Sequence, residues 1–339
     1  MSFKTKGGVA SMPLTGMLGH FAGLRGASGY GASSTAEQVA GDWDGSGKTV
    51  LITGANTGLG LECARVLASR GAEVVIAVRD AAKGAAAAGK IRSRHPEARV
   101  SVLPLDLASL ESVKAAAEEF KSAGRQLHIL VLNAGVMACP FMRTADGHEM
   151  QFGTNHLGHF ALVRHLEDAL LSTARASGVP GRVVSLSSSA HFGPYAAEPI
   201  RSEADIDSEA GYSPWQAYGQ SKLCNVLLAR ELHKRWKAEG KPLLAYACHP
   251  GVIPSSELFR HSKLPWVVQA PLLMALSPVF KSIAQGAATQ TYLATSKDAA
   301  ALSGEYFADV NLSPSSAPSH DVALSARLWE MSERMCGFA

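Results

Sequence analysis

The stretch TGANTGLG at residues 53–60 decides the fold class of this 339-residue chain. It follows a short apolar segment at residues 49–53 and opens a segment with helical spacing at residues 59–70. Glycines at such a junction permit a tight turn and let the backbone approach a pyrophosphate, whose charge the helix N-terminus favours. The order strand, glycine-rich turn, helix therefore predicts a dinucleotide-binding turn. The spacing G-x-x-x-G-x-G differs from the G-x-G-x-x-G form, and an ordinary β–α turn is the alternative.

Outward from this turn, the chain alternates strand and helix patterns. Apolar runs predict strands at residues 74–78, 100–105, 129–132, 182–186 and 243–248, and helical spacing predicts helices at 81–94, 110–123, 147–171, 215–238 and 323–335. This alternation indicates βαβ units with right-handed crossovers, and the continuous apolar runs indicate a sheet covered on both faces. We therefore predict one α/β domain over residues 47–339, a Rossmann-type doubly wound parallel sheet with helices on both faces.

Composition excludes several classes of protein. Hydrophobic residues make up 47% of the chain and charged residues 18%, which is too apolar for a disordered protein. The formal charge is 32 − 29 = +3, and Lys4, Lys6 and Arg25 precede the first acid, Glu37. The remaining body is neutral, which argues against a nucleic-acid partner. The five cysteines are scattered without a C-x-x-C, as is typical of a reduced intracellular protein.

The first 46 residues differ from the rest of the chain. They are rich in Gly, Ala and Ser and show no sustained period, which predicts an amphipathic or disordered lead before the domain. An N-terminal segment that contains Lys, Arg and Ser but no acid before Glu37 is typical of a plastid or mitochondrial targeting sequence. A cytoplasmic protein is the alternative.

Charged residues after the second predicted strand bear on cofactor choice. Arg79 ends this strand, Asp80 follows it, and Lys83 lies one turn further on. A cation at this place binds the 2′-phosphate of NADP(H), whereas an acid binds the ribose hydroxyl of NAD. Arg79 and Lys83 favour NADP(H), and Asp80 leaves NAD, or a solvated pair at a helix start, as alternatives. Asp106, after the third strand, is placed to meet an adenine.

The segment YGQSK at residues 218–222 puts a phenol and an ammonium group four residues apart. On a helix, Tyr218 and Lys222 lie one above the other on the same face. A nearby cation favours phenolate, so we expect Lys222 to lower the pKa of Tyr218, as a general acid or base near neutral pH requires. An exposed helical pair is the alternative for this spacing alone.

Taken in order, these motifs resemble those of the short-chain dehydrogenase/reductase family. The matching segments are TGANTGLG at 53–60, NAG at 133–135, Asn155, the serines at 187–189, YGQSK at 218–222 and HPG at 249–251. DGHE at 146–149 and GEYFAD at 304–309 resemble the retinol-dehydrogenase-like branch. GYGASSTAE at 29–37 is similar to the entry segment of the plant dehydrogenases of the chloroplast inner-envelope translocon.

The resemblance implies roles for individual residues. Tyr218 would give a proton to a carbonyl oxygen, Lys222 would lower its pKa and hold the nicotinamide ribose, Ser188 would hydrogen-bond the same oxygen, and Asn155 would hold a water of the proton relay. Ser187 and Ser189 stay open as alternatives to Ser188. The cofactor-binding set that it implies is Gly54, Asn56, Thr57, Gly58, Leu59, Gly60, Arg79, Lys83, Asp106, Leu107, Asn133, Ala134, Gly135, Tyr218, Lys222, Pro250, Gly251, Ile253 and Ser255. Ser255 takes the place of the family's usual threonine after HPG, with Ser256 as the alternative.

The function implied is that of an NADP(H)-dependent carbonyl reductase or alcohol dehydrogenase acting on a lipophilic aldehyde, ketone or alcohol. The alternative is a regulatory subunit that senses the NADP(H) redox state at a chloroplast envelope translocon. An apolar stretch predicts a substrate lid at about residues 252–282 that touches a membrane surface. Homodimers or tetramers are expected from the resemblance. No metal is expected, because no Cys or carboxylate completes a ligand set around His156 and His159.

Overall fold

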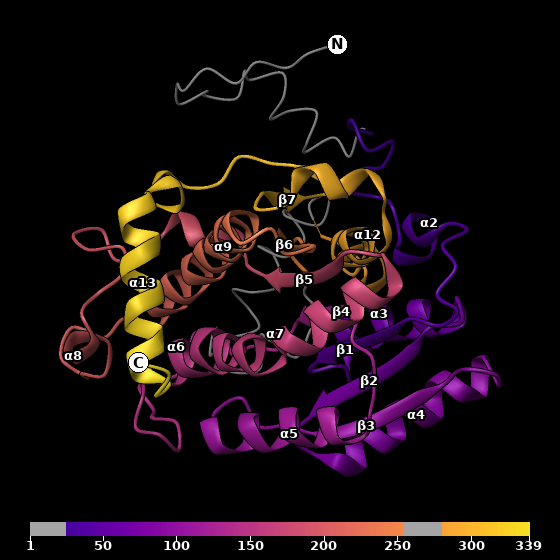
Figure 1. Ribbon diagram of the computed structural model, residues 1–339. Coiled ribbons are helices and arrows are strands. Elements are labelled where there is room, and N and C mark those ends of the chain that lie inside the picture. Colours follow the sequence, from indigo (N-terminus) through magenta and orange to yellow (C-terminus); the bar gives the residue numbers. More distant parts are fainter. Residues whose placement is uncertain (1–24, 254–279) are drawn as a thin grey trace, which may run out of the picture.

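The computed structural model describes residues 25–253 and 280–339 and contains one eight-stranded sheet (Figure 1). Its strands lie in the order β3-β2-β1-β4-β5-β6-β7-β8, parallel except for β8. They are β1 (Thr49–Thr53), β2 (Glu73–Val78), β3 (Val100–Pro104), β4 (Ile129–Leu132), β5 (Gly181–Leu186), β6 (Leu243–His249), β7 (Tyr306–Ala308) and β8 (Asn311–Leu312). The order reverses between β1 and β4, so a crevice is expected at the carboxyl ends of these strands.

Helices cover both faces of the sheet, which confirms the doubly wound fold. One hydrophobic cluster joins the sheet to α3 (Gly58–Ser69), α4 (Ala81–Arg94) and α12 (Ala288–Thr295), and another joins it to α5 (Leu110–Ser122), α7 (Gly158–Ser177) and α9 (Pro214–Ala238). The C-terminal helix α13 (Val322–Met335) packs on α9. Shorter helices are α2 (Ala36–Ala40), α6 (Met150–Phe152), η1 (Gly153–Leu157), η2 (Ser189–Phe192), α8 (Glu203–Ile206), α11 (Ile283–Gly286), η5 (Asp298–Leu302) and η6 (Ala317–His320).

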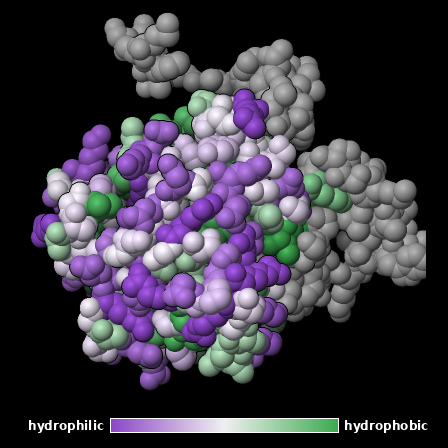
Figure 2. Space-filling view, turned by 90° about the vertical axis from the view of Figure 1, so that its right-hand side faces the viewer, coloured by the Kyte–Doolittle hydropathy of each residue, from purple (hydrophilic) through white to green (hydrophobic). Residues whose placement is uncertain are grey.

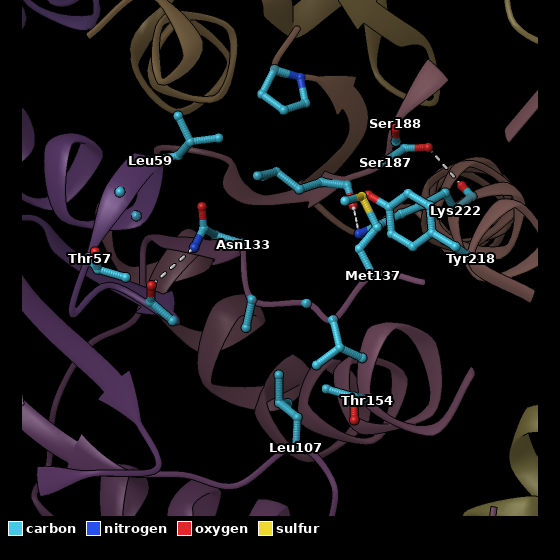
Figure 3. A pocket seen from close by; sticks show the side chains of 18 of the residues that line it. Thr57, Leu59, Leu107, Asn133, Met137, Thr154, Ser187, Ser188, Tyr218 and Lys222 are labelled. Atoms are coloured by element: carbon cyan, nitrogen blue, oxygen red, sulfur yellow. Dashed lines mark hydrogen bonds between the residues drawn. The ribbon is translucent and has the colours of Figure 1, made fainter. Parts of the chain in front are cut away.

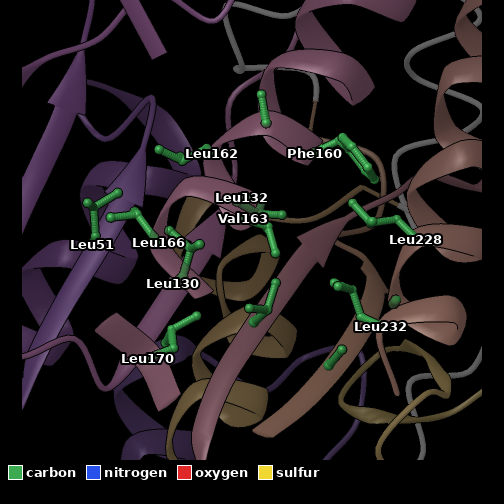
Figure 4. Close-up of a cluster of buried hydrophobic side chains, with 14 of the residues drawn as sticks. Leu51, Leu130, Leu132, Phe160, Leu162, Val163, Leu166, Leu170, Leu228 and Leu232 are labelled. Atoms are coloured by element: carbon green, nitrogen blue, oxygen red, sulfur yellow. The ribbon is translucent and has the colours of Figure 1, made fainter. Parts of the chain in front are cut away.

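The sheet is buried because its strands carry apolar residues on both sides. Every residue of β1 and of β4 is buried. Figure 4 shows leucines of β1, β4, α7 and α9 meeting on one face of the sheet, among them Leu51, Leu130, Leu132, Leu162, Leu166, Leu170, Leu228 and Leu232. On the face of the molecule in Figure 2, hydrophilic side chains predominate and hydrophobic ones form only small patches between them. The helices thus turn their apolar stripes to the sheet.

The helix predicted for residues 147–171 begins later, ends later and is interrupted. Glu149 precedes it, and its buried carboxylate accepts hydrogen bonds from the N–H groups of Gln151 and Phe152 at 2.9 and 2.7 Å. A capping carboxylate of this kind begins a helix, so α6 starts at Met150 and not at residue 147. A π-helical turn at residues 153–157 then separates α6 from α7, which continues to Ser177. Periodicity alone does not reveal such a turn.

Residues 25–46 belong to the folded domain, which corrects the predicted boundary at residue 47. Thr35 and Gln38 form a capping box that starts α2, and Val39 is buried. Upstream of α2, the side chain of Asn311 in β8 accepts a hydrogen bond from the Ser28 N–H and donates one to the Tyr30 carbonyl. This segment therefore packs on α3, α12 and β8. The helices α2 and α12 and the strands β7 and β8 were not predicted, because each is too short for a clear period.

The predicted lid falls mostly on residues 254–279, outside the described residues, as does Ser255. The chain on either side of this segment is joined: Val252 and Phe280 form a parallel bridge, and the Lys281 N–H donates to the Val252 carbonyl at 2.9 Å. Among the helices that the structure describes, none has the length and apolar character needed to cross a membrane.

The packing of residues 25–46 predicts that a chain beginning at residue 47 is less stable than one beginning at residue 25. Burying one valine side chain contributes about 2 kcal/mol, and the truncation also removes the ion pairs of Glu37 with Arg65 and Arg70. Denaturant unfolding of the two chains measures the difference. Glu37→Gln in the longer chain is the control, since it removes the ion pairs and keeps α2. Equal stability of the two chains would place the domain boundary at residue 47 after all.

Candidate active site

A cavity of about 630 Å³ lies at the carboxyl ends of the strands, where the strand order reverses (Figure 3). Its volume is in the range of small-molecule and cofactor sites. Nearly all the predicted site residues line it: Gly54, Asn56, Thr57, Gly58, Leu59, Gly60, Arg79, Lys83, Asp106, Leu107, Asn133, Ala134, Gly135, Ser188, Tyr218, Lys222, Pro250, Gly251 and Ile253. Segments far apart in sequence therefore form one site.

The glycine-rich turn leaves an open cradle at one end of the cavity. Gly54 has a φ of +66°, which side chains rarely adopt, and a Cβ added at Gly60 would lie 2.5 Å from Nδ2 of Asn133. Asn133 fixes the turn by donating from Nδ2 to the Thr53 carbonyl at 2.9 Å. No side chain caps α3 at Thr57, and the first turn of α3 contains no acid. Its N–H groups are thus available to an anion, and the cradle fits a pyrophosphate.

The charged residues after β2 divide into two roles. The carboxylate of Asp80 caps α4 by accepting the Lys83 N–H at 3.0 Å, and this backbone hydrogen bond lowers the pKa of Asp80. Arg79 is exposed at the cavity, and no carboxylate in the described part of the chain pairs with it. Asp80 therefore has a structural partner, and the guanidinium of Arg79 is left for a ligand.

Tyr218 and Lys222 lie at the other end of the cavity, one turn apart on α9 (Figure 3). Each side chain is only 4% exposed. Nζ of Lys222 lies 5.6 Å from the centroid of the Tyr218 ring and donates to the Leu186 carbonyl at 3.0 Å. The spacing in sequence thus brings the phenol and the ammonium group together, as predicted.

The expected effect of Lys222 on Tyr218 is not found. Burial raises the pKa of Tyr218 to about 12, and a hydrogen bond with Ser188 acts against this rise. Burial also lowers the pKa of Lys222 to about 8. Both side chains are taken out of water, which disfavours the charged form of each, and the ammonium group is directed to a backbone carbonyl. The phenol is therefore protonated at neutral pH.

The three serines after β5 are distinguished by their contacts. The buried hydroxyl of Ser187 donates to the Lys222 carbonyl at 2.7 Å and so holds the backbone of α9. The Ser189 N–H donates to Nδ1 of His249 at 3.2 Å. The Ser188 side chain acts to lower the pKa of Tyr218, and its oxygen accepts the Ala190 N–H at 3.2 Å. The side chain of Ser187 and the backbone of Ser189 thus have structural partners, and which serine acts beside Tyr218 stays a prediction.

Asn155 does not line the cavity, although it was predicted as a site residue. It is fully buried in the π-helical turn, behind Gly135. Its Oδ1 accepts the Val136 N–H at 2.8 Å, and its Nδ2 donates to the Val136 carbonyl and to Oγ of Ser221, both at 2.9 Å. Its side chain thus supports the chain beside the cavity from behind, and holding a relay water stays a prediction.

Sequence reasoning missed several residues that line the cavity, although Val252 falls at the start of the predicted lid. Besides the predicted set, Met137, Met150, Thr154, Trp215 and Val252 line the cavity. Trp215 precedes Tyr218 by three residues on α9 and is 53% exposed. Because Trp215 lies one helical turn before Tyr218, the sequence could have indicated that it lines the same site. This wall is mainly apolar.

His156 and His159 do not form a metal site with other residues. Both are buried, and their rings bind different partners, Ser332 and Thr53. Within residues 25–253 and 280–339 no group of three or more His, Cys, Asp or Glu side chains could hold a metal ion.

Comparison with known proteins agrees with this geometry. The family model described as short chain dehydrogenase matches residues 48–201. The Brassica napus protein "Short-chain dehydrogenase TIC 32 A, chloroplastic" is 42% identical over 317 residues, covering 94% of this chain and 97% of that protein. This chain belongs to the short-chain dehydrogenase family. Human retinol dehydrogenase 12 is 45% identical over 291 residues, covering 86% of this chain and 87% of its own. The short-chain dehydrogenase/reductase is thus of the retinol-dehydrogenase-like branch.

Solved structures show the same fold. A Mycobacterium paratuberculosis protein superposes with a TM-score of 0.69 at 34% identity, covering 88% of this chain and 97% of its own. The Pseudomonas aeruginosa RhlG/NADP active-site complex superposes with a TM-score of 0.61 at 25% identity, covering 79% and 97%. The family is one of nicotinamide-dependent oxidoreductases, so the cavity of this dehydrogenase is the place for a nicotinamide cofactor.

Proposed function

We propose that this dehydrogenase transfers hydride between NADP(H) and a lipophilic carbonyl or alcohol. The observation that carries the proposal is one continuous cavity with Arg79 and the uncapped start of α3 at one end and Tyr218, Lys222 and Ser188 at the other. The first end suits the phosphates of a dinucleotide, and the second suits a polarised oxygen.

The roles of the chain's own residues follow from their surroundings. NADPH, when bound, supplies the hydride that reduces a carbonyl carbon. Tyr218, held protonated by burial, donates its proton to the carbonyl oxygen, and Ser188 donates a hydrogen bond to the same oxygen. Lys222 would hold the nicotinamide ribose, and Arg79 with Lys83 would hold the 2′-phosphate. The chain thus contributes orientation and a proton at a stated atom.

The substrate class follows from the apolar residues that line the cavity together with Tyr218. Met137, Met150, Trp215 and Val252 present apolar surface to the place where a substrate must lie. Such a wall favours an aliphatic, aromatic or retinoid-like aldehyde or ketone over a sugar or an acid. The retinol dehydrogenases among the relatives support this class.

The free guanidinium of Arg79 predicts a preference for NADPH that depends on this side chain. Arg79→Ala should weaken NADPH binding about 10- to 150-fold, because the 2′-phosphate loses a charged hydrogen-bond partner, and should leave NADH binding nearly unchanged. Titration of both cofactors by fluorescence measures this.

Arg94→Ala is the matched control for Arg79→Ala, since Arg94 is an exposed arginine in the last turn of α4 and does not line the cavity. Equal loss of NADPH and NADH affinity in Arg79→Ala would contradict the 2′-phosphate assignment. A preference of the unmodified protein for NADH would do the same and would favour Asp80 as the residue that selects the cofactor.

The protonated phenol predicts that Tyr218→Phe abolishes turnover and spares cofactor binding. Loss of a positioned general acid should lower kcat by roughly 100- to 10,000-fold, with the Kd for NADPH nearly unchanged. The assay follows NADPH consumption with a panel of aliphatic, aromatic and retinoid-like aldehydes.

Tyr246→Phe is the control for Tyr218→Phe, because the buried hydroxyl of Tyr246 donates to the Ala299 carbonyl and does not line the cavity. A Tyr218→Phe enzyme that retains wild-type turnover would exclude Tyr218 as the acid. Wild-type protein that neither binds NADPH nor reduces any member of the panel would refute the proposed activity itself.

A second candidate function is a plastid regulatory subunit that senses the NADP(H) redox state. The similarity to the chloroplastic TIC 32 proteins over 94% of the chain favours it, and the same Arg79 site would serve as the sensor. The two functions share the cofactor and differ in what the bound cofactor does. A plastid location, translocon partners and contact with the envelope surface belong to this second proposal.

The second candidate predicts that envelope proteins co-purify with the tagged full chain from intact plastids and that their amount changes between NADPH and NADP+. A fusion lacking residues 1–24, compared with a full-length fusion, tests whether these residues direct the protein to the plastid. Removing all 46 residues would also remove α2 from the domain. The sensor function would be refuted if the same amount of envelope proteins co-purified with NADPH and with NADP+, or if none co-purified with either. Identical cytosolic signal from both fusions would refute the plastid location.

A further inference from the structure

Two buried histidines contact the backbone of predicted catalytic residues and have no role in the proposed chemistry. His159 on α7 and His191 on η2 are both fully buried. Nδ1 of His159 lies 3.0 Å from the main-chain carbonyl oxygen of Asn155, and Nδ1 of His191 lies 2.6 Å from that of Ser188. The same ring atom thus meets the same kind of acceptor at two catalytic positions.

The hydrogen-bond partners of His159 determine which ring nitrogen carries its proton. The hydroxyl oxygen of Thr53 accepts the N–H groups of Asn133 and Ala134, at 2.9 and 3.0 Å. Since both lone pairs of this oxygen are used, its hydrogen must point to Nε2 of His159, 2.9 Å away. Nε2 is therefore an acceptor, and Nδ1 carries the proton that it donates to Asn155.

The same reasoning shows which ring nitrogen of His191 carries the proton. The backbone N–H of Ser316 can only donate, and it lies 3.1 Å from Nε2 of His191. Nε2 is again the acceptor, so Nδ1–H donates to the Ser188 carbonyl. Ser316 lies 125 residues further along the chain, so this ring joins the end of β5 to the segment before η6.

Neither ring is charged under ordinary conditions. Burial lowers the pKa of His159 to about 3 and that of His191 to about 4. A neutral imidazole with one donor and one acceptor is the species that both sets of partners require. The two contacts are therefore permanent features of the folded protein at the pH values where it would act.

We propose that His159 and His191 are positioning residues for the hydride-transfer reaction, each holding the main-chain carbonyl of a catalytic residue through Nδ1–H. His191 fixes Ser188, which lines the same cavity as Tyr218. His159 fixes Asn155, whose Nδ2 donates to Oγ of Ser221, and that hydroxyl donates to the Tyr218 carbonyl at 2.8 Å. The contact of His159 thus reaches the backbone of Tyr218, and that of His191 ends at the serine that lines the cavity with it.

The inference rests on the proposed function, because the orientation of Ser188 and Tyr218 matters only if they act on a bound oxygen. Misplacing a catalytic group by about 1 Å can cost on the order of 100-fold in rate. His159 also joins Asn155 to Thr53, whose hydroxyl holds the ends of β1 and β4 together beside the cofactor cradle. One ring thus connects the cradle to the catalytic backbone.

Asparagine and glutamine substitutions test the Nδ1 donor and the Nε2 acceptor of each histidine separately. The amide of asparagine reaches the place of Nδ1 and keeps a donor for the carbonyl, whereas the amide of glutamine reaches the place of Nε2 and keeps only that partner. His159→Asn and His191→Asn should retain kcat within about threefold. His159→Gln and His191→Gln should lower kcat at least about tenfold, with the Kd for NADPH changed less than about threefold.

His156 provides the matched control. It is buried in the π-helical turn, two positions before the start of α7, and its Nε2 meets Oγ of Ser332 on α13 and no residue that lines the cavity. His156→Asn and His156→Gln should leave kcat equal to each other and close to that of the wild type, whatever they do to the melting temperature. Melting temperature and NADPH affinity are measured for all six variants.

The inference would be overturned if kcat decreased in proportion to the melting temperature and did not differ between the asparagine and glutamine variants. The histidines would then have a merely structural role. If a glutamine variant does not fold, the alanine variant of the same histidine takes its place, because it also lacks the donor: a kcat at least about tenfold below that of the asparagine variant supports the inference, and an equal kcat overturns it. Wild-type protein without NADPH binding or turnover would refute the proposed function, and the inference with it. An active wild type with equally active glutamine variants would refute only the inference.

Discussion

The hydroxyl group of Thr53 joins two strand ends at the centre of the sheet and connects them to a buried histidine. It accepts the N–H groups of Asn133 and Ala134 and thereby joins the ends of β1 and β4, the two strands between which the strand order reverses. A doubly wound sheet must leave a crevice at this point, because the helices that follow the two strands cross to opposite faces. The width of that crevice depends on how closely the two strand ends approach. The parallel ladder of β1 and β4 sets this approach, and the buried Thr53 oxygen extends it to the strand ends and, through His159, to the Asn155 carbonyl.

Two kinds of interaction build the site, and they differ in what they specify. Burial of the apolar strands and helix stripes supplies most of the folding free energy, but it is non-directional and tolerates small shifts. The polar contacts around Thr53, Asn155 and Ser187 are directional and almost entirely buried, so each unmade bond would cost the desolvation of its partner. The hydrophobic layers therefore form the sheet, and the buried hydrogen bonds place the groups at its edge.

The sequence allowed most of the fold and most of the cavity to be predicted. Strands and helices of clear period, such as β1, α4 and β4, were expected at or within a residue or two of their observed bounds, and the motifs at strand ends converge on one cavity. The π-helical turn, α2 and the short strands at the C-terminal end carry too few residues for a period, and they depend on tertiary partners such as Asn311. The position of Asn155 behind the cavity and the raised pKa of Tyr218 depend on burial, which a motif does not report.

The burial of Lys222 links cofactor binding to the protonation of the site. Its pKa falls from 10.5 to about 8, so the folded chain disfavours the ammonium form by about 3 kcal/mol. For a base whose pKa is lowered on folding, this cost is complete below about pH 8 and disappears as the pH rises from there towards 10.5.

No carboxylate in residues 25–253 and 280–339 pairs with Lys222, and the hydrogen bond to Leu186 uses only one of its three donors. A bound nucleotide with ribose hydroxyl groups offers acceptors for the remaining donors. Binding would then reduce the cost of the ammonium form beside the phenol, the arrangement in which a cation favours phenolate. Burial therefore keeps the phenol protonated and leaves the ammonium form of Lys222 only modestly favoured near neutral pH, and acceptors on a bound nucleotide would strengthen that form.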